Sequence, residues 1–564
     1  MVGVIVGCEN SGQAHAVGFD HGEQFVDGVR GVDDDALACA LVAEEINEVH
    51  HLRSETVTDR EVPSREQLTK IEAVVVGHVD RLWRTLTYLM EQNQGTNLLV
   101  GDRLVALTDE MRAALDGGGR LIALPDEGSV LVVPGSIRAL VDDSVRRAQA
   151  AFALLQTTSE SVVDKFFLEF AALIDDDEKF GLVLEANRTD VDDALARGRA
   201  AGRLRITEKM RCDMAEGLRA WARLAIHRLE RTDVVDHGSW AVESWRSPLG
   251  VVGFVFEGRP NVFADAMGVL KTGNTVVFRI GSDAIRTARA IRDHVMLPAM
   301  QLAGLPTGCV VLIDAVEHSA GWALFGHTAV SLAVARGSGA AVAQLGQVAR
   351  QNGVPVSLHG TGGAWIIAGS RFDAPRLKSV IKHSLDRKVC NTLNTLVLVE
   401  GSLVASLDVV VSALGDLGRP VVVHTNDQRV AAALESTSCV DIRFGDVDPG
   451  QEWEWDETPE LTIVTAADVS DGVRTFNESS PQFVLSVVSS DQTETESAWQ
   501  SSNAAFFGDG FTRWVDGQFA LERPELGLAN WQGGRLLGRG GVLSGDGVHT
   551  VRLRAIQVDH DLHR

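Results

Sequence analysis

Residues 248–367 alternate short apolar runs with longer stretches in which apolar residues recur every three or four positions. Runs such as VVGFVF, NTVVFRI and AVSLAVA have the length of buried strands, and the stretches between them have the spacing of helices that cover a sheet. Repeated strand–helix units favour a parallel, doubly wound sheet with ligand sites at the carboxyl ends of its strands. We therefore expect functional residues in three loops, at 257–261, 279–282 and 336–339.

The sequence before this region has a different pattern. Residues 136–231 carry helical spacing over most of their length, and SWAVESW at 239–245 alternates as a strand of a hairpin does. Residues 1–138 combine strand-like runs (VGVIVGC, RLIALP and SVLVVPG) with helical spacing at 33–53 and 64–92. This first block has no nucleotide fingerprint and no metal spacing. We interpret it as an α/β segment for scaffolding or partner binding, with an unrecognised activity as the alternative.

Composition narrows the class of protein. The chain has 564 residues, too many for one compact core, so about three domains are expected. A net charge of −25 argues against nucleic acid or an anionic membrane as a main partner, because phosphate binding needs clustered cations. The six cysteines are widely spaced, which indicates a reducing compartment and no metal site. Neither a signal peptide nor an apolar window of roughly eighteen residues is found, so we expect a cytoplasmic protein.

One cysteine stands in a setting that favours catalysis. Cys390 lies in RKVCNTLNTLVLVE, where Lys382, Arg387 and Lys388 precede it and the apolar run Leu393–Val399 predicts a buried strand after it. Neighbouring cations lower the pKa of a thiol and so increase the share of nucleophilic thiolate. A strand directly after the cysteine would hold the nucleophile at the edge of a sheet. From these residues alone, a buried structural cysteine is the alternative.

The three expected loops have chemistry that suits an anion. In EGRPN, the amide of Asn261 either donates to a developing oxyanion or is that of a plain N-cap or turn asparagine. In FRIGS, Arg279 and the N–H groups at Ser282 suit a phosphate, although Gly-Ser pairs also precede helices that bind nothing; we expect Ser282 to cap the next helix. In RGSG, two glycines before a helix allow close approach of a dinucleotide. Three such loops on one sheet edge predict an anion-binding cleft.

Several longer motifs resemble one family. They are SPLGVVGFVFEGRPNVFADAMGVLKTGNTVVFRIGSDAI at 247–285, ARGSGAAVAQL at 335–345, VCNTLNTLVL at 389–398, FGDGFTRWVDGQFALERPELGLAN at 507–530 and GRGGV at 538–542. Over residues 142–556 the chain is similar to the gamma-glutamyl phosphate reductases (glutamate-5-semialdehyde dehydrogenases) of the aldehyde dehydrogenase superfamily. The resemblance implies an α/β, aldehyde dehydrogenase-like fold with a doubly wound parallel sheet.

The resemblance also implies a division into domains. An NADP-binding domain is expected at 139–232 and 249–386, and an α/β catalytic domain at 387–528. A small β oligomerisation element is expected at 233–248 and 541–564, so that the protein forms a homo-oligomer. Residues 1–138 have no counterpart in the family, so we interpret them as an additional N-terminal α/β block.

Residue roles follow from the same resemblance. Cys390 matches the nucleophile of the family, and Asn261 with the backbone N–H of Cys390 matches the oxyanion site. The positions that match the surroundings of the ribose, phosphates and nicotinamide of NADP are Arg279, Gly281, Ser282, Arg336, Gly337, Gly339 and Gln518. Gln518 is a departure, because the matched position is a glutamate in the family.

The implied reaction is NADPH-dependent reduction of gamma-glutamyl phosphate to glutamate-5-semialdehyde through a thioester on Cys390. The segment VSLHGTGGAW at 356–365 has no carboxylate to activate water, which favours an acyl phosphate over hydrolysis; His359 is a candidate base or a structural histidine. The unusual lead into Cys390 (Arg387, Lys388 and Val389) leaves two alternatives. One is a reductase of a related amino-acyl phosphate or a carrier-bound acyl thioester, and the other is a non-catalytic scaffold of the same fold.

Overall fold

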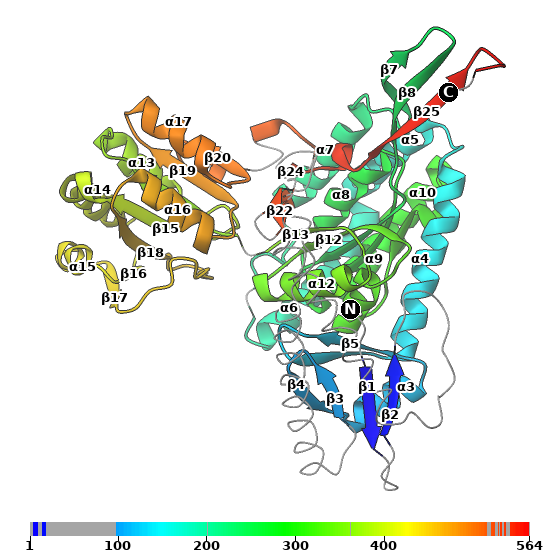
Figure 1. The fold of residues 1–564 in the computed structure, drawn as a ribbon, viewed down its shortest axis with the longest axis horizontal. Helices are drawn as coiled ribbons and strands as arrows, with labels where there is room; N and C mark the ends of the chain where they lie inside the picture. The colour runs from blue at the N-terminus through cyan, green and yellow to red at the C-terminus, as the bar shows by residue number, and fades with distance from the viewer. Residues whose placement is uncertain are drawn as a thin grey trace, which may run out of the picture. The chain divides into compact units, whose positions relative to one another are not determined.

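The computed structural model describes residues 4–8, 14–18, 97–199, 201–360, 362–515, 520–524, 528–529, 531–532, 535–536 and 542–562. The chain divides into two compact units, Met1–Ser136 and Ile137–Arg564 (Figure 1). The helices predicted at 33–53 and 64–92 lie outside the described residues. None of the described helices is both long enough and apolar enough to cross a bilayer.

The first unit contains antiparallel strands. Its four-stranded sheet has the order β2-β1-β3-β4 and is made of β1 (Val4–Cys8), β2 (Ala14–Gly18), β3 (Asn97–Val100) and β4 (Arg103–Ala106). Helix α3 (Asp109–Asp116) leads to the hairpin of β5 (Arg120–Leu124) and β6 (Ser129–Val133). The strands predicted from VGVIVGC, RLIALP and SVLVVPG are therefore confirmed.

Four helices open the second unit, as the spacing predicts. They are α4 (Gly135–Leu155), α5 (Glu160–Asp175), α6 (Asp177–Ala196) and α7 (Glu208–Arg223). Phe166, Phe167 and Phe170 are fully buried on one face of α5. Apolar residues spaced three or four positions apart lie on one face of a helix, so this spacing predicted α5 correctly. The carboxylate of Asp176 accepts hydrogen bonds from two N–H groups at the start of α6 and so fixes where that helix begins.

The first parallel sheet has the order β11-β10-β9-β12-β13. Its strands are β9 (Val251–Phe256), β10 (Thr275–Ile280), β11 (Val310–Leu312), β12 (Val330–Arg336) and β13 (Val356–His359). Every residue of β9 and β10 is buried, as expected for a parallel sheet with helices on both faces. The strand order reverses between β9 and β12, so the loops after these two strands meet at the topological switch point.

Short helices follow the strands of this sheet. They are α8 (Val262–Met267), α9 (Ile285–Ile291), α10 (Leu297–Ala303), α11 (His318–Phe325) and α12 (Gly339–Gln351). The predicted cap at Ser282 is wrong, because residues Ser282–Ala284 form a 3-10 turn and Ser282 follows the N-cap position, which Gly281 occupies without a side chain. The α-helix itself begins at Ile285.

The second parallel sheet has the order β17-β16-β18-β15-β14-β19-β20. Its strands are β14 (Ala364–Ala368), β15 (Leu393–Val399), β16 (Val421–Thr425), β17 (Val440–Phe444), β18 (Glu460–Ala466), β19 (Val484–Val488) and β20 (Phe506–Gly508). The helices after its strands are α13 (Ala374–His383), α14 (Leu403–Gly415), α15 (Gln428–Leu434), α16 (Val469–Ser479) and α17 (Gln492–Ser501). The strand predicted after Cys390 is confirmed as β15.

β14 belongs to this second sheet because it pairs with β15 and β19. The chain therefore enters the second sheet at Ala364, whereas the predicted boundary of the catalytic domain lies between residues 386 and 387. The run AWIIA reads as a buried strand in either sheet, so its pattern alone does not identify its partners.

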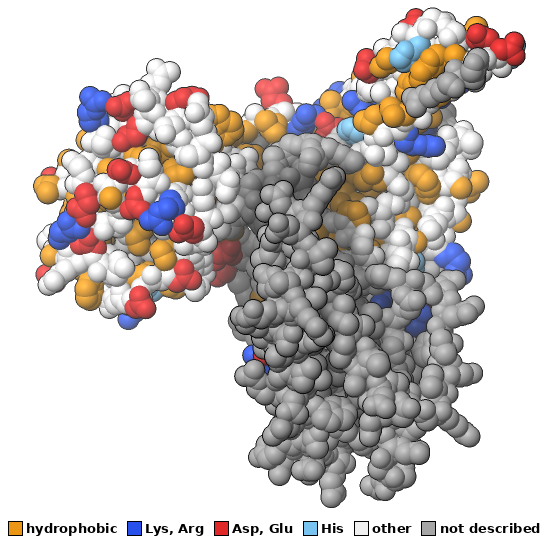
Figure 2. Space-filling view, in the orientation of Figure 1, with side chains coloured by type: hydrophobic (Ala, Val, Ile, Leu, Met, Phe, Trp, Pro, Cys, Tyr) orange, Lys and Arg blue, Asp and Glu red, His pale blue; other side chains and the backbone are white. Residues whose placement is uncertain are grey.

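A three-stranded antiparallel sheet joins the two segments predicted to form the oligomerisation element. Its order is β25-β8-β7, from β7 (Glu230–Asp236), β8 (Trp240–Ser247) and β25 (Thr550–Gln557). Apolar side chains such as Val235, Val551 and Leu553 are exposed on it (Figure 2). Its role in assembly stays a prediction. Two strand pairs precede β25: β21 (Leu528–Ala529) with β24 (Val542–Leu543), and β22 (Trp531–Gln532) with β23 (Arg535–Leu536).

A buried asparagine in the LKTGN motif ties the C-terminal segment to the first sheet. The side-chain oxygen of Asn274 accepts hydrogen bonds from the N–H groups of Leu249 (2.7 Å) and Gly250 (3.1 Å). Its amide nitrogen donates to the hydroxyl of Thr272 (2.9 Å) and to the carbonyl of Val548 (2.7 Å). Because Asn274 is fully buried, water has no access to replace these partners. The asparagine therefore fixes where β9 begins and where β25 approaches it.

We expect Asn274→Ala to lower the free energy of unfolding by about 3 kcal/mol, because it leaves several buried backbone groups without partners. Urea unfolding followed by circular dichroism measures this loss. Asn503→Ala is the matched control, since Asn503 is exposed and its side chain is not buried in any core. Equal stability of the two variants would contradict the anchoring role of Asn274.

Candidate active site

Cys390 lies in a tight loop between α13 and β15. The hydroxyl of Thr392 donates to the carbonyl of Arg387 (2.6 Å) and accepts from the N–H of Val389 (2.9 Å), which closes the loop around the cysteine. The N–H of Gly363 donates to the carbonyl of Cys390 (2.9 Å). Gly362 has a φ of +78°, and a Cβ there would collide with Cys390. These contacts hold the backbone of Cys390 firmly at the start of β15.

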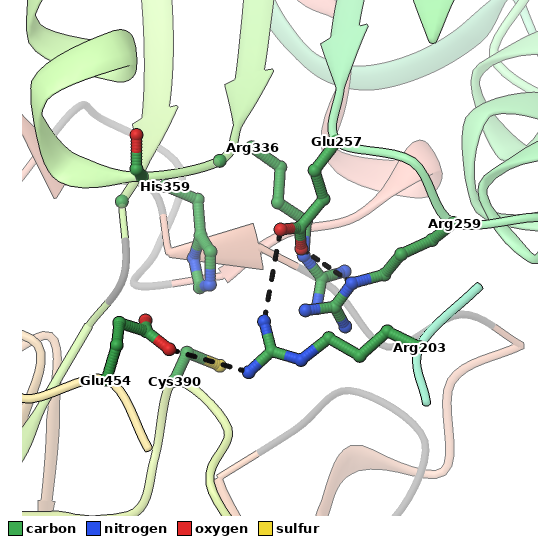
Figure 3. Close-up of a pocket in the computed structure, with 10 residues that line it drawn as sticks. Arg203, Glu257, Arg259, Arg336, His359, Cys390 and Glu454 are labelled. Atoms are coloured by element: carbon green, nitrogen blue, oxygen red, sulfur yellow. Dashed lines mark ion pairs between the residues drawn. The ribbon is translucent and has the colours of Figure 1, made fainter. Parts of the chain in front are cut away.

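The half-buried Cys390 opens into a cavity of about 230 Å³ (Figure 3). The other lining residues are mostly charged or lie at strand ends of the first sheet, and they are Arg203, Glu257, Arg259, Arg336, Gly337, Ser338, His359, Gly360 and Glu454. Residues 257 and 259 follow β9, residues 336–338 end or follow β12, and residues 359–360 end or follow β13. The nucleophile candidate therefore faces the carboxyl edge of the nucleotide-type sheet, at its switch point.

Ion pairs organise the cavity. Glu257 lies 2.5 Å from Nε of Arg259 and 3.9 Å from Arg203, and Arg203 lies 3.9 Å from Glu454. Burial and the nearby charge of Arg336 together lower the pKa of Arg259 to about 10, although Glu257 and Cys390 act in the opposite direction. Arg259 therefore stays charged at neutral pH. The cavity is lined by three guanidinium groups and two carboxylates.

Lys388 is the one cation of the predicted Lys382–Arg387–Lys388 group that is buried. Burial lowers the pKa of Lys388, and the nearby Glu454, Glu452 and Cys390 oppose that shift. The predicted field around the thiol thus comes from Lys388 together with Arg259, each of which interacts electrostatically with Cys390.

His359 is buried at the end of β13 and lines the same cavity. Burial lowers the pKa of His359 to about 3, and the charges of Arg336 and Arg259 act in the same direction. The imidazole is therefore neutral at physiological pH. A group with so low a pKa is a weak base, which disfavours the candidate role of His359 in activating water.

Glu454 reaches the cavity from a segment between β17 and β18 that sequence reasoning missed. Asn394, next to the start of β15, donates to the carbonyl of Gln451 (2.8 Å) and accepts from the N–H of Trp453 (2.9 Å). The Trp453 ring stacks on His424 with 3.8 Å between centroids. The alternating sequence EWEWDE is the signal that was available, since alternation turns glutamates and tryptophans to opposite sides of an extended segment.

The structure brings Cys390, Arg336 and Gly337 together in the cavity, and Asn261 is not among the lining residues. Asn261 occupies the N-cap position of α8 without a side-chain capping hydrogen bond. The side chain of Asn261 therefore makes no capping hydrogen bond, and the residue lies in the turn before α8, so both the oxyanion role and the plain turn asparagine stay predictions. Gly339 begins α12, and Gln518 lies outside the described residues.

The loop after β10 has features that fit a phosphate-bearing cofactor. Arg279 is buried, donates to the carbonyl of Val316 (2.8 Å), and keeps a buried Nε without a hydrogen-bond partner among the described residues. A Cβ on Gly281 would lie 2.8 Å from the backbone nitrogen of Gly258, so the two loops approach this closely only because position 281 is glycine. Donors that lack partners and exposed backbone are what a pyrophosphate requires.

The other described cysteines do not have this setting. Burial raises the pKa of Cys309 to about 12, which keeps it a thiol. Cys212 is exposed on α7, away from the lining residues of the cavity. Within the described part of the chain, no group of three His, Cys, Asp or Glu side chains is placed to hold a metal ion. The sequence indicated Cys390 and the loop that contains Glu257 and Arg259, without a role for either residue. It gave no indication of Arg203 or Glu454.

Comparisons with known proteins agree with this geometry. The model of the aldehyde dehydrogenase family matches residues 125–403. A gamma-glutamyl phosphate reductase of Rhizobium johnstonii is 30% identical over 434 residues, covering 73% of this chain and 94% of the relative. A protein of the same name from Bradyrhizobium diazoefficiens is 32% identical over 359 residues, covering 60% of this chain and 76% of the relative.

Solved structures show the same fold. The crystal structure of gamma-glutamyl phosphate reductase from Thermotoga maritima has a TM-score of 0.66 at 21% identity, and the match covers 75% of this chain and all (100%) of that one. A propionaldehyde dehydrogenase from Clostridium phytofermentans has a TM-score of 0.53 at 14% identity, with 75% and 98% covered. The predicted aldehyde dehydrogenase-like α/β fold is confirmed, and that fold implies a nicotinamide cofactor. The protein is an oxidoreductase that acts on an aldehyde group, and the chain belongs to the gamma-glutamyl phosphate reductase family of the aldehyde dehydrogenases.

Proposed function

We propose that this protein reduces gamma-glutamyl phosphate to glutamate-5-semialdehyde and inorganic phosphate through a thioester on Cys390, with NADPH as the reductant. The observation that carries the proposal is Cys390, which opens into an arginine-lined cavity at the switch point of a nucleotide-type sheet. The names of the relatives supply the substrate. An anionic acyl donor matches the guanidinium groups around the sulfur.

Acylation needs a thiolate. Lys388 and Arg259 both lie close enough to Cys390 to interact with it electrostatically, which places positive charge near the reacting sulfur. This sulfur attacks the acyl carbon, the S–C bond forms, and the C–O bond to the phosphate breaks. Phosphate leaves with the electron pair of that bond, and Cys390 keeps the acyl group as a thioester.

The tetrahedral oxyanion needs donors. The side-chain amide of Asn261 and the backbone N–H of Cys390 are the proposed pair, and the lack of a capping hydrogen bond at Asn261 supports this role. A donor that is already oriented toward the oxyanion costs no reorganisation when charge develops, so Asn261 would act mainly on the rate of the chemical step.

Residues at or just after the ends of β10 and β12 would hold the cofactor: Arg279, Gly281 and Ser282 at the adenosine side, with Gly337 and Gly339 nearby. When bound, NADPH supplies the hydride that reduces the thioester to the aldehyde. Asp283, the acidic residue of this region, accepts hydrogen bonds from Arg199 (2.7 and 2.8 Å) and also pairs with Arg197 (3.1 Å). Its charge is thus neutralised, which supports the 2′-phosphate of NADP over the free ribose of NAD.

Reduction is favoured over hydrolysis because none of the described residues that line the cavity is available as a general base. Glu257 pairs with Arg259 and Arg203, Glu454 pairs with Arg203, and His359 is too weak a base. A thioester on Cys390 therefore waits for hydride, or for phosphate in the reverse direction.

Replacing the nucleophile tests the mechanism directly. We expect Cys390→Ala to reduce turnover to background in an assay with glutamate-5-semialdehyde, phosphate and NADP, followed by absorbance of the reduced cofactor. Cys212→Ala is the matched control and should keep wild-type turnover, because Cys212 is exposed and does not line the cavity. Turnover retained in Cys390→Ala would contradict the thioester. A wild-type protein that is inactive here but reduces a carrier-bound acyl thioester would contradict the proposed substrate.

Replacing the oxyanion donor separates catalysis from capping. We expect Asn261→Ala to lower kcat by about 100- to 1,000-fold with little change in stability, because the amide stabilises charge only in the transition state. The control is Asp468→Ala, which removes a real cap that accepts from the N–H of Asp471 (2.9 Å) and should cost about 1 kcal/mol of stability with kcat unchanged. Steady-state kinetics and urea unfolding give both readouts. An unchanged kcat in Asn261→Ala would remove Asn261 from the mechanism.

The depressed pKa of His359 predicts a dependence of stability on pH. Between its ordinary pKa of 6.5 and the folded value of about 3, the unfolded chain binds a proton at His359 and the folded protein does not. The contribution of His359 to the free energy of unfolding is therefore at its full value above pH 6.5. Below pH 6.5 the free energy of unfolding falls by about 1.4 kcal/mol per pH unit. His359→Gln should flatten this decline between about pH 6.5 and 5, measured by urea unfolding, whereas exposed His383→Gln should not. Identical slopes for wild type and His359→Gln would refute the prediction.

A further inference from the structure

Arg336 differs from the other arginines of the cavity. Its side chain is the last of β12, is only 9% exposed, and lines the cavity beside Cys390 (Figure 3). Arg203 and Arg259 each have a carboxylate partner. The guanidinium of Arg336 has no hydrogen bond and no ion pair with any residue that the structure describes. It is a buried cation that still lacks an anion.

The groups around Arg336 do not provide that anion. Glu257 is 2.5 Å from Arg259, and Glu454 reaches Arg203. His359 is neutral, and the positive charge of Arg336 contributes to lowering its pKa. Arg336 also lowers the pKa of Arg259, so the two guanidinium groups repel each other across a short distance. Burying an unpaired charge beside a like charge is unfavourable, and a bound anion relieves both effects.

The size of the cavity limits the anion. At about 230 Å³, the cavity is smaller than the pockets of roughly 300–1,000 Å³ that hold larger organic ligands. A phosphoryl group fits such a space, and the planar guanidinium matches two phosphate oxygens at once. Cys390 lines the same cavity, so an anion on Arg336 lies next to the sulfur that reacts.

We propose that Arg336 binds the phosphoryl group of the acyl donor, and inorganic phosphate in the reverse reaction, rather than a phosphate of the cofactor. This inference deepens the proposed function and rests on it. As the S–C bond forms, the C–O bond breaks and its electron pair stays on the departing phosphate. Arg336 neutralises that growing charge. In reverse, Arg336 holds the phosphate whose oxygen attacks the thioester and displaces the sulfur as thiolate.

Alkylation of Cys390 tests the site without turnover. Iodoacetamide labelling of the full chain is followed by peptide mass spectrometry, with and without inorganic phosphate, and labelling of the exposed Cys212 in the same sample is the internal reference. We expect phosphate to slow labelling of Cys390 at least fivefold in wild type and in Arg350→Gln, a control on the exposed face of α12. Arg336→Gln should lose this protection. Equal protection in wild type and Arg336→Gln, or none in wild type, overturns the proposal.

Kinetics distinguish the phosphate from the cofactor. In the reverse reaction, Arg336→Gln should raise the KM for phosphate by tenfold or more and leave the KM for NADP within twofold, with Arg336→Lys intermediate. A rise confined to the KM for NADP overturns the proposal, because Arg336 would then bind the cofactor. A shift in the pH profile of Cys390 labelling with unchanged protection by phosphate also overturns it, because Arg336 would then stabilise the thiolate. Arg336→Lys keeps the charge and guards against a folding defect in Arg336→Gln.

The two proposals fail separately. If wild-type protein has no reductase activity but phosphate protects Cys390 through Arg336, the reaction assignment fails and the anion site stands. If wild type turns over gamma-glutamyl phosphate and Arg336→Gln keeps its phosphate KM, the anion site fails and the reaction assignment stands.

Discussion

The hydrogen bond from the N–H of Glu257 to the carbonyl of Arg336 (3.1 Å) ties together the ends of β9 and β12. The next bond in the same direction runs from the N–H of Gly337 to the carbonyl of His359 (3.2 Å), at the end of β13. Three strands of the first sheet thus end in one fixed register. Because the register is fixed by backbone bonds, the side chains of Glu257, Arg336 and His359 have no freedom to drift apart. The cavity is a consequence of where these strands stop.

Cations gathered at such an edge need compensation, and the second sheet provides part of it. Asn394, the second residue of β15, holds the segment that carries Glu454, and the same strand follows Cys390. One element therefore positions both the nucleophile and a carboxylate that pairs with Arg203. Among the described residues, no carboxylate forms an ion pair with Arg336. Its missing partner is informative because buried charges in proteins are otherwise paired.

The sequence was most informative where a property is local. The run Leu393–Val399 became β15 without a change of boundary, because a short, mostly apolar run is typical of a buried parallel strand. Cys390 was recognisable from its own neighbours. The sequence did not show that β14 belongs to the second sheet, because AWIIA has no feature that selects β15 and β19 as partners. Ser282 failed as a cap for a related reason, since the chain forms a 3-10 turn there before the helix begins.

The cavity charges were the least predictable part of the site. Arg203, Glu257 and Glu454 come from three separate parts of the chain and meet only through tertiary structure. Arg259 and Arg336 stood inside loops that the sequence marked as functional, yet nothing local distinguishes an arginine with a carboxylate partner from one without. Pairing is a property of the assembled cavity. It becomes visible only when the distances among all its charged groups are known.

The net charge of −25 does not conflict with an anionic substrate. Salt screens exposed charges over about 8–10 Å, so most of the surface carboxylates have little effect inside a small, partly buried cavity. Acidic and basic side chains are interspersed over the part of the protein built from the second sheet (Figure 2), which weakens any uniform field further. Within the cavity, Arg336, which has no ion pair with the described residues, and the adjacent Arg259 dominate, because burial strengthens their interactions. The buried Lys388 does not line the cavity but interacts electrostatically with Cys390. Global charge thus argues only against long anionic polymers as partners, whereas the local charge of the cavity suits a small anion.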